Sequence, residues 1–210
     1  MSFAAAERTR LRDLLVEVGP DAPTLCEGWL TRDLAAHLYI RERRLDAVGG
    51  NWISVLKPRL DKVTAEVMQR PYADVVHEWG DRAVLPSPID ALINTAEHFV
   101  HHEDVRRCQP DWQSRELEHS EQEQLYGAVK RMARLLVRGA SVPVIVEPQG
   151  FPRFVATNGP RAHGVSADGS DVIRVTGPVG EVALWLFGRT YRGVTVAGEE
   201  SAIAALNRSV

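Results

Sequence analysis

The residue pattern changes near Gly139, and this change restricts the folds that the chain can adopt. Before Gly139, apolar residues recur at helical spacing between helix start and stop signals. After Gly139, short β-branched runs alternate with Gly, Pro, Asn and Asp turns. Helices followed by short strands are typical of an α+β protein. We therefore expect a helical bundle over residues 1–138 and a small α+β domain over residues 139–210.

Local start and stop signals predict the individual elements. Thr31 is the expected N-cap of the second helix, and Ser87 and Ser120 begin two further helices through capping motifs. Pro71 is expected to interrupt the third helical region. The predicted helices of the bundle cover residues 3–18, 31–48, 57–82, 87–108 and 120–138. The second domain is predicted to contain strands at 142–146, 151–156, 172–176 and 194–196, and helices at 179–187 and 199–206.

Composition narrows the classes of function. The hydrophobic fraction of 44%, the charged fraction of 25% and the net charge of -3 are those of an ordinary globular protein without a nucleic-acid-binding face. Apolar runs are too short to span a bilayer, and the N-terminus lacks signal-peptide features, so we expect a cytoplasmic protein. Cys26 and Cys108 are expected to be reduced, with Cys26 a half-buried thiol. The choice between monomer and homodimer stays open.

A histidine-rich segment, residues 97–104, holds three of the seven histidines and three carboxylates. Glu97 and His101 are four residues apart and share a helix face, so they can hold one ion. A carboxylate with an imidazole suits zinc or a similar divalent metal. His37 is predicted on another apolar helix, at the spacing of its core positions, and bundle cores build metal sites from facing helices. Alternatively, Glu97 and His101 form a surface pair and His37 is a hydrogen-bonded core residue.

The remaining members of the segment have different expected roles. His98 and His102 lie about 100° around the helix from Glu97 and His101, so we expect them to point to solvent or to a neighbouring element. Asp104 is three residues beyond His101 and can orient its second ring nitrogen. A salt bridge of Asp104 with Arg107 or Arg8 is the alternative.

Two motifs resemble a known family. Residues 26–38, with Gly28-Trp29, Asp33 and His37-Leu38, resemble a signature of the mycothiol-dependent maleylpyruvate isomerase family, within the DinB-like group of metal-binding four-helix bundles. Its second signature, E-x-x-x-H-x-x-D, is matched by Glu97, His101 and Asp104. The resemblance implies a divalent metal, usually zinc, held by His37, Glu97 and His101. Three protein ligands and one open position are the pattern of a catalytic zinc site.

The C-terminal part also resembles this family. Residues 177–189 are similar to a segment of its small second domain, which has a sterol-carrier-like α+β fold. Arg189 or Arg192 is a candidate for binding an anionic substrate at the domain junction, since arginine binds carboxylates bidentately. Alternatively, either arginine only keeps its charge in water at the end of a buried helix.

The resemblance to this family implies a type of reaction. A metal acting as a Lewis acid would activate a small thiol such as mycothiol, which then attacks a small electrophilic substrate in an isomerisation or an S-transfer. Two other functions stay open on the same scaffold. One is a metal-binding protein without catalysis, and the other is a carrier of a small ligand.

Overall fold

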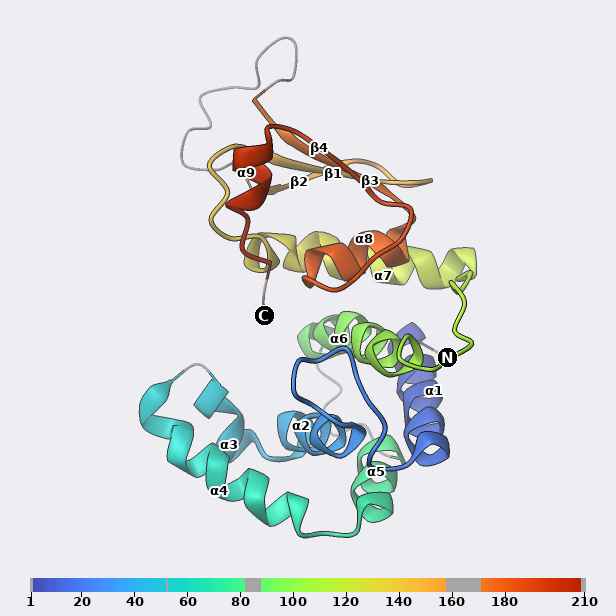
Figure 1. Cartoon of the computed structure of the whole chain (residues 1–210), viewed down its shortest axis with the longest axis vertical. Coiled ribbons are helices and arrows are strands. Elements are labelled where there is room, and N and C mark those ends of the chain that lie inside the picture. The colour runs from blue at the N-terminus through green and yellow to red at the C-terminus, as the bar shows by residue number, and fades with distance from the viewer. Residues whose placement is uncertain (1, 52, 82–87, 158–170, 209–210) are drawn as a thin grey trace. The chain divides into compact units, whose positions relative to one another are not determined.

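The contacts of the chain divide it into two compact units. The computed structural model describes residues 2–51, 53–81, 88–157 and 171–208 (Figure 1). The units are Met1–Ser114 and Arg115–Val210, whereas the sequence predicted the boundary after residue 138. The difference is the helix α7 (His119–Leu136), which packs on α8 and β2 of the second unit. Val179–Leu186 forms α8 and Phe154–Thr157 forms β2.

The first unit is helical. Helix α1 packs against α5 and α6, and α2 packs against α4 and α5. No described helix combines the length and the apolar character needed to cross a membrane. The elements are α1 (Phe3–Val18), α2 (Thr31–Arg43), α3 (Leu45–Val48), the 3-10 turns η1 (Gly49–Asn51) and η2 (Ser54–Leu56), α4 (Lys57–Met68), α5 (Tyr72–Asp81) and α6 (Pro88–Arg106).

Most predicted helices are present, with corrections at their ends. Pro71 separates α4 from α5 as expected. The N-cap prediction for Thr31 was wrong: Leu30 precedes the helix, its N–H donates to Asp33, and the Thr31 hydroxyl donates to the Gly19 carbonyl. Helix α2 stops at Arg43, short of residue 48. The predicted capping residue Ser87 lies outside the described residues.

The core of the first unit consists of apolar side chains that the helices share. The side chains of Leu11 and Leu15 from α1, Leu34 and Leu38 from α2, and Trp79 from α5 are almost completely inaccessible to solvent. Burying one such side chain contributes about 1.5–3 kcal/mol. This shared core fixes α2 against its neighbours and so positions the polar residues on its other faces.

The second unit is a small α+β structure. Its strands β1 (Val144–Pro148), β2, β3 (Ile173–Gly177) and β4 (Thr195–Ala197) form a sheet in the order β2-β1-β3-β4. Strands β1 and β3 are parallel, and the two outer pairs are antiparallel. Helices α7 and α8 contact strands of this sheet, and α9 (Glu200–Ala204) follows β4 (Figure 1). The predicted α+β class is confirmed.

Both ends of helix α7 differ from the sequence prediction. Helix α7 has its N-cap at Glu118, whose N–H donates to Glu121 at 3.2 Å, so the capping role predicted for Ser120 was wrong. Gly139 was expected to end this helix, which stops three residues earlier. Gly139 has a φ of +71°, and a Cβ atom at this position would lie 2.9 Å from the Ala205 carbonyl oxygen. Glycine is the residue that fits this backbone.

Candidate metal centre

Helix α6 and helix α2 bring three predicted ligand residues together. Glu97 and His101 lie one turn apart on α6, and Oε2 of Glu97 is 3.4 Å from Nε2 of His101. His37 reaches the same place from α2, and one donor atom from each of the three residues lies within 4.8 Å of the others. We call His37, Glu97 and His101 the donor trio.

The donor trio is held in a partly buried setting. The His37 ring lies 5.4 Å from the His101 ring at 71° and 5.2 Å from the Trp29 ring. His101 is buried, while the side chain of Glu97 is 14% exposed and that of His37 is of intermediate exposure. The aromatic ring of Trp29 therefore supports the imidazole of His37 beside its partner on α6.

Asp104 binds the second nitrogen of the His101 ring. Its Oδ2 atom accepts a hydrogen bond from Nδ1 of His101 at 3.0 Å, and Asp104 is fully buried. This is the contact expected of a carboxylate that orients a metal-binding histidine. Of the two arginines considered as alternative partners, Arg8 pairs with Glu42, and Arg107 lies 2.7 Å from Glu103.

Cys26 joins this cluster, a contact that the sequence interpretation missed. Its Sγ donates to Oδ2 of Asp104 at 3.1 Å and lies 4.0 Å from Nδ1 of His101. The neighbouring Leu25 N–H donates to the Asp104 carbonyl oxygen at 3.0 Å. The available signal was the position of Cys26 just before the Gly28-Trp29 motif, but the sequence predicted only a half-buried thiol there. The loop between α1 and α2 is thus attached to α6 at Asp104.

The charges of the donor trio are strongly coupled. Burial alone would raise the pKa of Glu97, but the His101 hydrogen bond and the charges of Arg41, His101 and His37 lower it to about 2. Burial would lower the pKa of His101, but hydrogen bonds to Asp104, Cys26 and Glu97 raise it well above its ordinary value. A metal would have to replace the proton of this imidazolium.

The donor set fits a divalent metal. Two imidazoles and one carboxylate are the ligand types of catalytic zinc sites. Since Nδ1 of His101 is engaged by Asp104, Nε2 is the nitrogen that faces Glu97. The arrangement can therefore offer one nitrogen from each histidine and one oxygen from Glu97 to a common ion.

His98 and His102 are buried rather than exposed. The two residues are 1% and 6% accessible, so of the two predicted alternatives the structure supports contact with neighbouring elements, which are α1 and α2. Nδ1 of His102 lies 3.0 Å from Glu7 on α1. Nδ1 of His98 lies 3.0 Å from the Ala4 carbonyl oxygen, and Nε2 lies 2.8 Å from Glu42 on α2. Polar residues on α1 and α2 supply partners that periodicity alone did not reveal.

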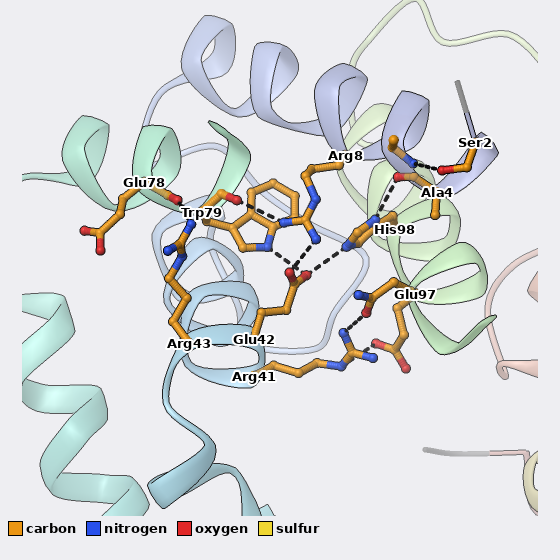
Figure 2. Close-up of polar contacts among 12 residues, drawn as sticks. Ser2, Ala4, Arg8, Arg41, Glu42, Arg43, Glu78, Trp79, Glu97 and His98 are labelled. Atoms are coloured by element: carbon orange, nitrogen blue, oxygen red, sulfur yellow. Dashed lines mark hydrogen bonds and ion pairs between the residues drawn. The ribbon is translucent and has the colours of Figure 1, made fainter. Parts of the chain in front are cut away.

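Glu42 is the centre of a buried polar network that the sequence did not indicate. Figure 2 shows Arg8, Trp79 and His98 directed at its carboxylate, and we call these four residues the Glu42 network. Nε1 of Trp79 donates to Oε1 at 3.0 Å, while Arg8 contacts Oε2. Burial would raise the pKa of Glu42, but His98, Arg8 and Trp79 together lower it to about 2. The network links α1, α2, α5 and α6.

Arg189 and Arg192 both lie after α8 in the second unit. The Arg189 side chain donates to the Phe187 carbonyl oxygen at 3.2 Å. The backbone N–H of Arg192 donates to Glu181 at 2.8 Å. Their role in binding an anionic substrate stays a prediction.

The described residues thus form a helical unit, in which three side chains of metal-ligating types converge, and a small α+β unit. No family model matches the chain, and no curated protein matches it in sequence. Two solved structures match its fold over 92% of this chain and 88% of theirs, each with a TM-score of 0.59. They are the mycothiol-dependent maleylpyruvate isomerase, at 14% identity, and a histidine-to-alanine mutant of a mycothiol-dependent maleylpyruvate isomerase, at 13%. The resemblance to that family is supported at the level of the fold.

Proposed function

We propose that the chain is a zinc-dependent enzyme that uses a small thiol, such as mycothiol, to isomerise or S-conjugate a small electrophilic substrate. The convergence of His37, Glu97 and His101 within 4.8 Å carries this proposal. The fold likeness to a mycothiol-dependent isomerase supports the thiol-dependent class of reaction. We also propose the DinB-like arrangement of the helical part and the sterol-carrier-like arrangement of the small α+β part that the sequence resemblance implies.

Each residue of the centre has a separate task in this proposal. His37 and His101 offer neutral nitrogen ligands, and Glu97 offers an anionic oxygen, so Glu97 is not a free base. Asp104 keeps the proton of His101 on Nδ1 and thereby leaves Nε2 as the ligand atom. Trp29 packs beside the His37 ring and supports its position. A divalent ion, when bound, supplies Lewis-acid chemistry that favours the thiolate form of a thiol.

Metal analysis of the purified protein tests the proposal. We expect stoichiometric zinc in the wild type and loss of metal from His37→Ala after dialysis, because two donors alone hold a zinc ion weakly. His77→Ala is the matched control, since His77 is an exposed histidine on α5. Unchanged metal in His37→Ala would contradict the assigned centre. Conjugation of a thiol to a generic electrophile by the loaded wild type then tests the reaction class, and a loaded protein without such activity would be a metal-binding protein only.

Replacement of Asp104 tests the orienting role separately. We expect Asp104→Ala to weaken zinc affinity by about 10–100-fold, since the His101 ring loses the partner that fixes its tautomer. Asp104→Asn keeps an acceptor oxygen and should lose less. Competition with a chromophoric chelator measures both affinities. An Asp104→Ala variant with wild-type affinity would exclude this role.

A further inference from the structure

Arg41 places a positive charge beside the donor trio. It follows His37 by four residues, so both side chains project from the same face of α2. Its Nε atom is 3.7 Å from Oε2 of Glu97, and its Nη1 atom donates to Oδ1 of Asn94 at 2.5 Å. Figure 2 shows Arg41 and Glu97 directed at each other. The Arg41 side chain is 15% exposed, so it is largely but not completely buried.

The Arg41 guanidinium has more N–H donors than its hydrogen bond to Asn94 uses. A guanidinium carries five N–H donors in a planar fork that matches a carboxylate. Among the contacts within the described residues, its hydrogen bond goes to the neutral amide oxygen of Asn94. The distance to Glu97 exceeds the length of a hydrogen bond. A second acceptor can therefore bind without displacing a bonded carboxylate.

The charge balance of the loaded centre favours an anion at this position. If His37 and His101 bind as neutral ligands, the two carboxylates of Glu97 and Asp104 balance a divalent ion. Arg41, which lies 3.7 Å from Glu97, then adds one positive charge to a centre whose other formal charges already sum to zero. Charges of like sign in a partly buried site repel strongly, and an incoming anion relieves that repulsion.

We propose that Arg41 binds a carboxylate group of the small molecule that occupies this centre. The inference rests on the proposed function and specifies its ligand class: a thiol or an electrophile that carries a carboxylate. Arg41 would bind that group bidentately and thereby orient the ligand beside the donor trio.

Two thiols that differ in one group test the inference. Cobalt-loaded protein is titrated with thioglycolate and with 2-mercaptoethanol, and the sulfur-to-cobalt absorption band reports binding. We expect thioglycolate to bind about 10-fold more tightly than 2-mercaptoethanol, the factor typical of one charge-assisted contact. Arg41→Gln should lose this preference, and Arg41→Lys should retain part of it. Arg32→Gln, a change on the same helix at an arginine whose side chain is 46% exposed, should retain all of it.

A second titration identifies which molecule carries the carboxylate. Succinate, which lacks a thiol, is titrated into the same cobalt-loaded proteins by calorimetry. Succinate binding that depends on Arg41 assigns the carboxylate to the electrophile, while a preference confined to thioglycolate assigns it to the thiol. Equal thiol affinities without succinate binding would overturn the role of Arg41 alone, as would an Arg41→Gln variant that changes only in melting temperature. Protein that takes up no cobalt would overturn the metal centre and this inference with it.

Discussion

Replacement of Glu42 by alanine is expected to lower the free energy of unfolding by about 3–5 kcal/mol, as for other buried ion pairs that lose one partner. The carboxylate of Glu42 is the common acceptor for Arg8, Trp79 and His98. Without it, the guanidinium of Arg8 stays buried without its counter-charge, and the indole N–H of Trp79 loses its acceptor. Urea denaturation of both proteins measures the difference.

Glu42→Gln is the matched control, and pH separates charge from packing. The pKa of Glu42 is lowered from 4.5 to about 2 in the folded state. A depressed folded pKa gives stability that is present above about pH 4.5 and is lost as the pH falls toward 2. This contribution is about 3 kcal/mol in the wild type and should be absent in Glu42→Gln. Equal acid sensitivity of the two proteins, or a Glu42→Ala variant as stable as the wild type, would contradict the account of the Glu42 network.

Glu97→Gln is expected to weaken zinc affinity by more than about 100-fold. The substitution removes the anionic ligand from the donor trio and leaves Arg41 near the ion without the carboxylate that lies 3.7 Å from it. Two unit charges about 4 Å apart interact by roughly 4 kcal/mol at an effective dielectric constant of 20. This energy exceeds the roughly 2.7 kcal/mol that corresponds to a 100-fold change in affinity. Chelator competition measures the affinity.

Two variants make this result specific. Glu66→Gln changes a carboxylate on α4 whose side chain is 50% exposed, and it should bind zinc as the wild type does. The double variant Glu97→Gln/Arg41→Gln should recover part of the lost affinity, because it removes the unbalanced cation. A Glu97→Gln protein within a few-fold of wild-type affinity would exclude Glu97 as a ligand.

The sequence predicted helices and strands well where local signals determine them. The spacing of Leu11 and Leu15, the break at Pro71 and the β-branched run before Pro148 each describe the chain's own backbone preferences. The ends of the helices were less predictable because they depend on tertiary contacts. The Thr31 hydroxyl donates to a carbonyl twelve residues away instead of capping its helix. The unit boundary differed for the same reason, since α7 packs on α8.

The candidate site was predictable only in part. Helical periodicity placed Glu97 and His101 on one face and separated them from His98. It could not show that Glu42 and Glu7 supply partners for the second face, because those residues lie 56 and 95 positions away in sequence. The contact of Cys26 with Asp104 depends on the path of a loop, which has no periodicity to read.

Helix α6 has consequences for how this chain can evolve. Its first face supplies Glu97 and His101 to the donor trio, and its second face binds α1 and α2 through His98 and His102. A one-residue insertion or deletion before residue 97 would turn both faces by about 100° together. The position of the donor trio and the packing of the helical unit therefore both depend on the register of α6. Point substitutions on the first face can remove the donor trio without changing the second face, whereas an insertion or deletion within this helix would disturb both faces at once.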